Sequence, residues 1–283
     1  MLLYHWFLEF FSYFLYYLNL YDFICHYCLK YVFTLFNMFI IIIFFNFSWI
    51  CLGLLLKFLN RGDFVKNKKT YYKFLLKTFF ILCFTFSFIA LIVNFTLIFK
   101  PLYYMDINVL NIEESSGLNK NELKANYDYL ITYLTQNKTE EFNLPTLPSS
   151  EHGKIHFKEV KIIFDKIKVI FAFSIVISII GVILNNKNKR IDYLLTSSIL
   201  LLVMPLILLI PFMISFDKSF TAFHKIFFNN DYWLFDITAD PIINILPQDF
   251  FFHCALLILA LIITISIILR RIYRVQYKKL NSL

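Results

Sequence analysis

The chain has 283 residues, of which 59% are hydrophobic and 20% aromatic, and its mean hydropathy of +0.67 lies outside the range of soluble domains. Its net charge is +8, but Lys and Arg stand in short clusters beside apolar runs, which excludes a basic nucleic-acid-binding face. The five cysteines give no disulfide framework, and the C-x-x-C pair Cys25 and Cys28 has no second ligand pair for a metal. We therefore predict a polytopic, all-α integral membrane protein.

Apolar runs of about 20 residues, long enough to cross a bilayer, recur along the chain. They occupy residues 31–56, 78–99, 169–184, 193–214 and 253–269. A further aromatic stretch, 1–20, carries Glu9 and lacks the basic start and cleavage site of a signal peptide, so we expect it to span the membrane or lie in its interface. The prediction is a core of four transmembrane helices in residues 68–283, preceded by a hydrophobic extension of one or two helices in residues 1–67.

Three clusters of basic residues set the expected topology. They are Lys57, Arg61, Lys66, Lys68, Lys69, Lys73 and Lys77, then Lys187, Lys189 and Arg190, and finally Arg270, Arg271, Arg274, Lys278 and Lys279. Positive charge beside apolar runs favours the cytoplasmic side. Residues 100–168 and 215–252 are then the two extracytoplasmic segments, and we expect both to be partly helical.

The first outer segment is expected to begin as an extended stretch, to turn at residues 115–118 and to continue as a helix over about 120–136. Asn119 and Glu122 have the spacing of a capping box at the start of that helix. A second helix, amphipathic over 151–165, should lead into the membrane.

Four of the six histidines fall on the predicted outer side or its boundary, namely His152, His156, His224 and His253. On a helix, His152 and His156 lie one turn apart and share a face. Such a pair can bind Zn²⁺, but no H-E-x-x-H motif and no third ligand is evident, so we predict no metal and keep a zinc hydrolase as a third hypothesis. A simpler interpretation of His156 is an interfacial residue with its ring at headgroup depth.

The second outer segment combines His224 with aromatic residues and carboxylates. A carboxylate such as that of Asp231, Asp236, Asp240 or Asp249 can orient an imidazole ring. Structural interpretations compete with this one, because Asp240 precedes a proline and suits a turn, and Asp231 suits a helix cap. Trp233 is expected to anchor at the membrane interface.

The sequence contains no G-x-S-x-G elbow, no P-loop and no dinucleotide fingerprint. If the protein is an enzyme, we therefore expect acid–base and positional catalysis without a cofactor. Neutral imidazole is the usual base near pH 7, and two histidines from separate outer segments can converge over a bundle of few helices.

Several short motifs together resemble the lipoprotein intramolecular transacylase (Lit) family, over about residues 77–271. They are residues 151–161 around His156, 223–228 around His224, 230–233, Asp240 and 246–251, with 126–131 in the first outer helix. For residues 1–67 the family offers no role.

The resemblance implies a four-helix enzyme of the bacterial cytoplasmic membrane whose active site faces the extracytoplasmic side. Such an enzyme transfers the sn-2 acyl chain of a diacylglyceryl lipoprotein to the α-amine of that lipoprotein's own N-terminal Cys, giving the lyso form. It makes His156 and His224 the catalytic candidates and needs no cofactor; the partners are the lipoprotein substrate and membrane lipid, not nucleic acid. Residues expected to bind or orient the substrate are Tyr127, Asn230, Asp231, Trp233, Asp240 and Asp249.

The shortage of strong catalytic motifs leaves an alternative, a non-enzymatic membrane protein that binds lipid or assists secretion. That alternative predicts that substitution at both histidines is tolerated.

Overall fold

The computed structural model describes residues 68–137 and 140–282, with the side chains of 68–71, 208–210 and 213 excepted. All regular structure within these residues is helical, which confirms the predicted all-α class. The predicted extension of residues 1–67 lies outside the described residues. The chain forms two compact units, a larger one of Phe74–Pro205 with Asn230–Leu283 and a smaller one that includes Leu206–Asn229.

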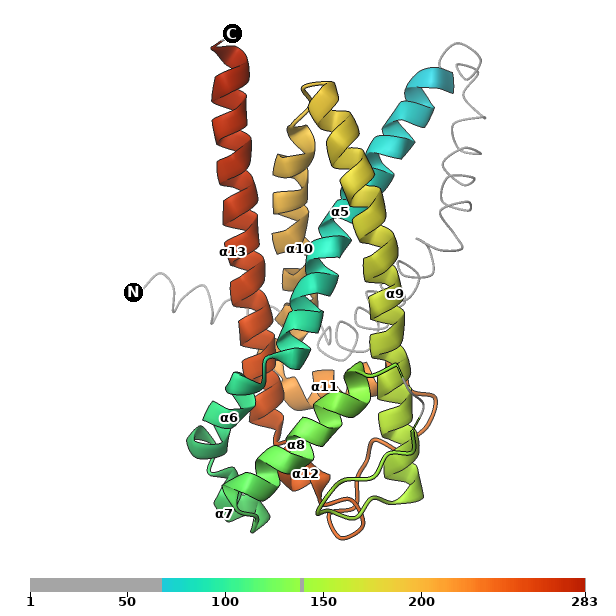
Figure 1. Ribbon diagram of the computed structural model, residues 1–283, viewed down its shortest axis with the longest axis vertical. Helices are drawn as coiled ribbons and strands as arrows, with labels where there is room; N and C mark the ends of the chain where they lie inside the picture. Colours follow the sequence, from blue (N-terminus) through green and yellow to red (C-terminus); the bar gives the residue numbers. More distant parts are fainter. Residues whose placement is uncertain (1–67, 138–139, 283) are drawn as a thin grey trace, which may run out of the picture. The chain divides into compact units, whose positions relative to one another are not determined.

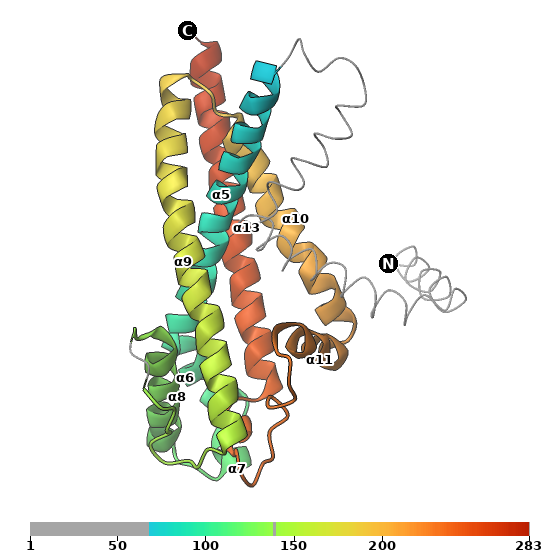
Figure 2. The ribbon, with the colours of Figure 1, turned by 90° about the vertical axis from the view of Figure 1, so that its right-hand side faces the viewer.

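Three helices are long and apolar enough to cross a membrane. They are α5 (Lys68–Ile98), α9 (Glu151–Lys187) and α13 (Gln248–Asn281). α10 (Asp192–Ile214) is a further apolar helix, of 23 residues. Each apolar run predicted between residues 78 and 269 falls within one of these helices, apart from Phe99, which follows the last residue of α5. A count of four membrane crossings remains a prediction. Figure 2 shows α5, α9 and α13 extending in the same general direction within the larger unit.

α5, α10 and α13 share an apolar core within the larger unit. Tyr193 of α10 packs edge-on against Phe80 and Phe84 of α5, with ring centroids 5.1 and 5.3 Å apart. Polar contacts join α10 to α13, because Ser266 Oγ donates to the Ser198 carbonyl at 2.8 Å. Short polar side chains of this kind allow close helix packing and hydrogen bonds between helices in a membrane.

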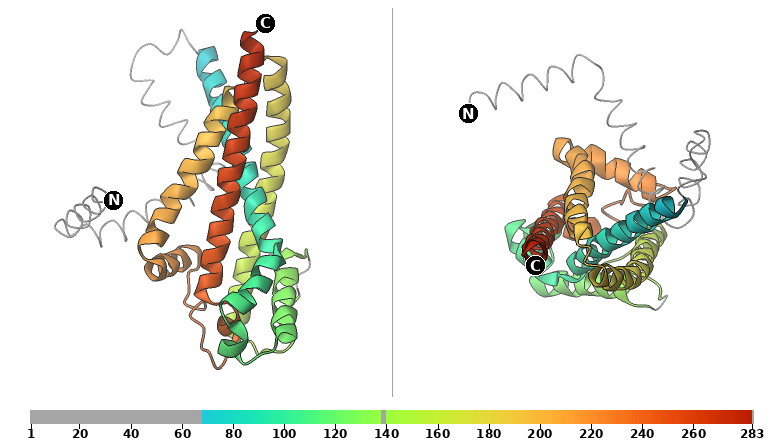
Figure 3. Two further views of the ribbon diagram at one scale, coloured as in Figure 1. Left: turned by 90° about the vertical axis from the view of Figure 1, so that its left-hand side faces the viewer. Right: turned by 90° about the horizontal axis from the view of Figure 1, so that it is seen from above.

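A second core lies at one end of these long helices, formed by short helices of the first outer segment and the chain before α13 (Figure 1). The helices are α6 (Lys100–Val109), α7 (Ile112–Ser116), α8 (Lys120–Thr135) and α12 (Ile242–Ile245). The left panel of Figure 3 shows the same grouping after a 90° turn about the vertical axis of Figure 1. Tyr103 of α6 stacks on Tyr127 of α8 at 3.9 Å between ring centroids, and its hydroxyl donates to the Ile245 carbonyl at 2.9 Å.

The extended stretch expected at the start of the first outer segment is wrong, because α6 and α7 are helical. Pro101 stands in the first turn of α6, where its fixed φ suits a helix start and its missing N–H is not needed. Tyr103, Asp106 and Ile107 then repeat at helical spacing and are buried. The expected turn is confirmed, since Gly117 ends α7 with φ +72°.

α8 begins with the predicted capping box and is fixed to α9 at its other end. The Asn119 side chain accepts from the Glu122 amide at 3.1 Å, and the Glu122 carboxylate accepts from the Asn119 amide at 3.0 Å. The last carbonyls of a helix lack partners within the helix. At the C-terminus of α8, Lys168 of α9 donates to two of these carbonyls, and Lys161 of α9 donates to the carbonyl of Gln136, which directly follows α8. α8 is therefore positioned along the first turns of α9.

The predicted amphipathic helix over 151–165 and the following apolar run form one continuous helix, α9, of 37 residues. At a rise of about 1.5 Å per residue it is roughly 55 Å long, well beyond the roughly 30 Å of a bilayer's hydrocarbon. Its first turns therefore project from the membrane-spanning part as a rigid extension, and this extension carries His152 and His156.

Candidate active site

The first turns of α9 and the connection of residues 230–247 belong to the larger unit and contact each other. His156 is buried there, with 5% of its surface exposed. Its ring meets the Phe235 ring edge-on at 5.4 Å and lies 5.7 Å from the Phe157 ring. The expectation of a ring at headgroup depth is therefore not met, because aromatic side chains of the protein itself enclose His156.

Asn230 and Trp233, both predicted site residues, are joined to α9 through one hydrogen-bonded turn. Asn230 Nδ2 donates to Glu159 Oε1 at 2.9 Å, while Asn230 Oδ1 accepts from the Tyr232 amide at 3.1 Å. The indole N–H of Trp233 donates to the Asn230 carbonyl at 3.1 Å, and the Trp233 side chain is buried. Trp233 therefore packs inside the protein and holds the turn, instead of anchoring at a lipid interface as expected.

Asp240 holds the N-terminus of α9. Its carboxylate is buried and accepts from the Ser150 amide at 2.8 Å and from the Ser150 hydroxyl at 2.6 Å. The same hydroxyl caps α9 by accepting from the Gly153 amide at 3.0 Å. A Cβ atom added at Gly153 would lie 2.2 Å from Asp240 Oδ1, so only glycine fits this close approach. Asp240 thus orients the helix that carries His156, where the sequence suggested that it orients a ring directly.

Replacing Asp240 by alanine should lower both stability and activity, because the half-buried Ser150 amide and hydroxyl lose their buried acceptor. A lost buried partner costs about 1–3 kcal/mol, and α9 would lose its fixed position at the site. The thermal unfolding midpoint in detergent and the product yield would measure the two effects. The matched control is Asp236→Ala, an exposed aspartate of the same connection whose carboxylate accepts from the Thr238 amide and hydroxyl within its own turn. Equal loss in both variants would contradict a specific role for Asp240.

Asp231 and Asp249 are exposed, and in the described part of the chain neither carboxylate is hydrogen-bonded to a histidine. Asp249 lies in the first turn of α13, where a negative charge favours the positive end of the helix dipole. Asp231 begins a turn, so the helix cap considered for it is wrong. Their roles in binding substrate remain predictions.

Tyr127 is buried in the second core, which α6, α7, α8 and α12 form, and it does not lie at an open surface. Its ring stacks on Tyr103 and meets Phe250 edge-on at 5.8 Å, and burial raises the pKa of its hydroxyl. Its contacts support the packing of α8 against α6 and α13. Any influence of Tyr127 on substrate would therefore act through this packing.

His224 lies on α11 (Phe216–Phe227), within the smaller unit. Its Nδ1 lies 2.8 Å from the Phe220 carbonyl oxygen, and its ring packs against Phe220 at 4.0 Å and Phe228 at 5.6 Å. Because a carbonyl can only accept, Nδ1 carries the proton of this bond, which leaves Nε2 of the neutral ring as a proton acceptor. Burial lowers the pKa of His224, and the bond to Phe220 opposes this more weakly. The neutral base is thus favoured at pH 7, while convergence with His156 remains a prediction.

His152, the other histidine of α9, is exposed, and its ring stacks on Tyr232 at 4.1 Å between centroids. Among the described residues no group of three or more His, Cys, Asp or Glu side chains could hold a metal ion.

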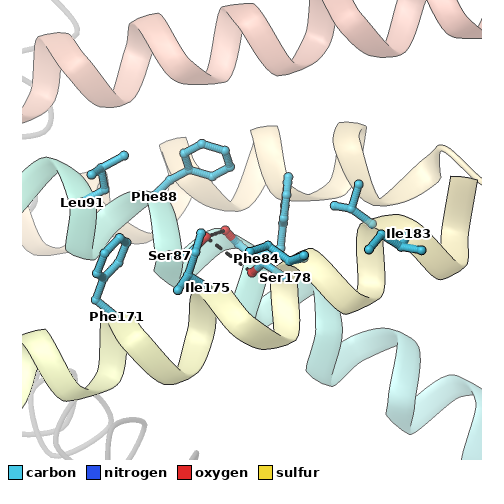
Figure 4. Close-up of a pocket in the computed structure, with 10 residues that line it drawn as sticks. Phe84, Ser87, Phe88, Leu91, Phe171, Ile175, Ser178 and Ile183 are labelled. Carbon is cyan, nitrogen blue, oxygen red and sulfur yellow. Dashed lines mark hydrogen bonds between the residues drawn. The ribbon is translucent and has the colours of Figure 1, made fainter.

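A crevice of about 270 Å³ opens between α5 and α9 (Figure 4). Apolar side chains line it, together with Ser87 and Ser178, whose hydroxyl oxygens lie 3.5 Å apart. Next to it, Gly181 allows close approach of the helices, since an added Cβ would lie 2.0 Å from the Phe80 ring. Ser178 lies roughly 33 Å along α9 from His156, at about 1.5 Å per residue. The crevice therefore lies in the long apolar part of α5 and α9, far from His156.

From the sequence, no role in the site is assigned to two acidic residues that the structure places in contact with other polar groups, although one of them, Glu159, lies in the motif around His156. Glu159 bonds Asn230 and stands three residues after His156 on the same helix, a spacing that is visible in the sequence. Asp106 accepts from His253 Nδ1 at 2.8 Å and is 3% exposed. Its only signal in the sequence is a carboxylate on the apolar face of α6.

Comparison with known proteins gives a consistent result. The family model described as lipoprotein intramolecular transacylase Lit matches residues 78–251. The solved structure of the membrane integral lipoprotein intramolecular transacylase Lit from Bacillus cereus is 40% identical, and the match covers 76% of this chain and 100% of that chain with a TM-score of 0.73.

Two structures of the Bacillus cereus protein with one histidine replaced, by alanine or by arginine, match with TM-scores of 0.71 and 0.69. Both are 40% identical, over 76% of this chain and 98% of those chains. No curated protein matches the chain significantly. The extent of the family match and the identity over the full length of a solved relative establish that this chain belongs to the lipoprotein intramolecular transacylase family of integral membrane enzymes.

Proposed function

We propose that this protein transfers the sn-2 acyl chain of a diacylglyceryl-modified lipoprotein to the α-amine of the lipoprotein's own N-terminal Cys. The observation that carries the proposal is the 40% identity to the Bacillus cereus transacylase across the whole of that chain. Both histidine-centred motifs lie within residues 78–251, the part that the family model matches. The product would be an N-acyl, S-monoacylglyceryl lipoprotein, the lyso form.

The reaction exchanges an ester for an amide within one molecule. The amine nitrogen attacks the ester carbonyl carbon, the new N–C bond forms, and the bond from that carbon to the sn-2 oxygen breaks. The nitrogen loses a proton and the leaving glyceryl oxygen gains one, so the total number of acyl chains is unchanged. No oxidant, reductant or second substrate is required.

Histidine suits both proton transfers. An α-amine has a pKa of about 7.7–8 and is mostly protonated at neutral pH, so a base must remove a proton before nitrogen can attack. The hydrogen bond of His224 Nδ1 makes Nε2 the proton-accepting nitrogen of the neutral ring, and His156 is the second candidate for proton transfer. Because amine and ester share one modified Cys, their reaction is intramolecular. Holding the two groups in the reacting orientation can then lower the activation barrier by about 7 kcal/mol or more.

The proposed location is the bacterial cytoplasmic membrane, with the outer segments on the extracytoplasmic side. Lys77 near the start of α5, together with basic residues at the turn between α9 and α10 and at the end of α13, supports this orientation. In the larger unit these positions lie at the end of the long helices opposite to α6, α7 and α8 (Figure 1). Positive charge favours the cytoplasmic side, which leaves the first turns of α9 outside.

The test uses bacteria that leave a model lipoprotein diacylated with a free α-amine. Mass spectrometry compares the N-terminal peptide of this lipoprotein from cells that contain this chain and from cells that lack it. We expect the chain to shift one acyl group from the glyceryl moiety to the amine, with the total acyl mass unchanged. An unaltered diacylglyceryl peptide in cells that contain the protein would contradict the proposal and favour a lipid-binding role. A gain of acyl mass would indicate transfer from another lipid instead.

A further inference from the structure

Only one of the two oxygens of the Glu159 carboxylate accepts a hydrogen bond from the described residues. Oε1 accepts from Asn230 Nδ2 at 2.9 Å. Oε2 is buried, and no donor for it exists among the described residues. A buried acceptor without a donor costs about 1–3 kcal/mol and more when it is charged, so an oxygen of this kind needs an explanation.

The orientation of this carboxylate is fixed by the turn opposite. Asn230 Oδ1 accepts from the Tyr232 amide, which directs Nδ2 of the same side chain toward Glu159. The Asn230 carbonyl in turn accepts from the indole of buried Trp233. One oxygen of Glu159 is thus held in place by a rigid turn, while the other remains for a donor from outside the described chain.

The basic side chains near Glu159 on α9 do not supply that donor. Lys161 is buried but donates to the Gln136 carbonyl and lies 3.4 Å from Asp165, and Lys158 is exposed. Within the described residues, Glu159 forms no ion pair with Lys or Arg. The donor that Glu159 Oε2 lacks is therefore best supplied by a bound cation that carries several N–H groups.

Glu159 stands one helical turn after His156. Residues three apart on a helix share a face, with Cβ atoms about 5–6 Å apart. A small group bound to Glu159 Oε2 would thus lie next to the side of α9 that carries the candidate imidazole. A cation bound there would be close enough for the proton transfer that amide formation requires.

We propose that Glu159 Oε2 binds the α-ammonium group of the substrate's N-terminal Cys. The inference rests on the proposed function and adds to it the site that recognises the attacking group. An ammonium offers three N–H donors, and a charge-assisted hydrogen bond to a carboxylate is about twice as strong as a neutral one. Binding at Glu159 holds the ammonium beside the histidine site, where a histidine removes one proton and passes it to solvent. The neutral amine then attacks, its second proton goes to the leaving glyceryl oxygen, and the charge-assisted attraction to Glu159 is lost.

Two analogues that cannot react test this site by binding alone. Both are Cys-peptides with two ether-linked alkyl chains on the glyceryl group; one has the free α-amine, and the other has hydrogen in its place. We expect the purified protein in nanodiscs to bind the amine form at least tenfold more tightly than the desamino form. Glu159→Gln, which places an amide N–H₂ or a neutral oxygen opposite the ammonium, should remove this preference, a tenfold change corresponding to about 1.4 kcal/mol.

The matched control is Glu151→Gln, which neutralises an exposed glutamate in the first turn of the same helix and should keep the preference. Glu159→Asp retains the negative charge and should keep part of the preference for the amine analogue. This variant keeps the site testable if the Glu159→Gln protein fails to fold. An unchanged preference in Glu159→Gln, or equal binding of both analogues by the wild type, overturns the ammonium site. An ester substrate assayed in parallel separates the ammonium site from the proposed function. If the wild type transfers the acyl chain but shows no preference for the amine analogue, only the ammonium site is overturned. If the wild type transfers no acyl chain, the proposed function is overturned.

Discussion

Acyl transfer by this protein should fall about 10²–10⁴-fold when His156 is replaced by alanine, the range that general acid–base groups contribute. The ring is buried between Phe157 and Phe235 on the rigid first turns of α9, so its position is fixed. His224→Ala should cause a similar loss, because it removes a second imidazole, whose bond to Phe220 makes Nε2 its proton-accepting nitrogen. The measurement is the initial rate of N-acylation of a diacylglyceryl Cys-peptide by purified protein.

His152→Ala is the matched control for the first of these variants. It removes a histidine one turn earlier on α9, whose ring is exposed and stacks on Tyr232. We expect its rate to stay within a few-fold of the wild type, with all variants retaining folded protein in the membrane fraction. Normal rates in both His156→Ala and His224→Ala would contradict histidine catalysis. A loss in His152→Ala equal to that in His156→Ala, reversed by added Zn²⁺, would instead favour the metal hypothesis.

Features that depend on local sequence were predicted well. The capping box of Asn119 and Glu122 needs only residues three apart, and an apolar run such as 78–99 marks a membrane helix by length alone. α6 was missed because burial of Tyr103 and Ile107 decides it, and that burial comes from contacts with α8 and α12. Local pattern specifies a helix only where the pattern is long enough to outweigh such contacts.

The candidate site was predicted in its parts and not in its connections. His156 and Asn230 were recognised from motifs, but the bond from Asn230 to Glu159 joins residues far apart in the chain. Asp240 was expected beside a ring, whereas it accepts from Ser150, a partner that only the close approach at Gly153 allows. Sequence spacing along one helix shows which residues share a face, but not which residue of a distant loop meets that face.

A large loss of stability is expected when Asp106 is replaced by alanine. Its carboxylate is 3% exposed and accepts from His253 Nδ1 at 2.8 Å, joining α6 to the start of α13. Removing this carboxylate leaves Nδ1 of His253, whose side chain is 29% exposed, without its acceptor, and the loss of a buried hydrogen-bonding partner costs about 1–3 kcal/mol. At about 2–4 °C per kcal/mol for a protein of this size, the unfolding midpoint should fall by up to about 12 °C.

Thermal unfolding in detergent, followed by intrinsic fluorescence, measures this loss, and Asp249→Ala is the matched control. Asp249 is an exposed aspartate in the first turn of α13, so its removal should change the midpoint by no more than a few degrees. If Asp106 acts through His253, the double variant Asp106→Ala with His253→Ala should lose less than the sum of the single losses, since residues in contact are not additive. Strict additivity would show that Asp106 stabilises α6 by another route and that its contact with His253 contributes nothing to the attachment of α6 to α13.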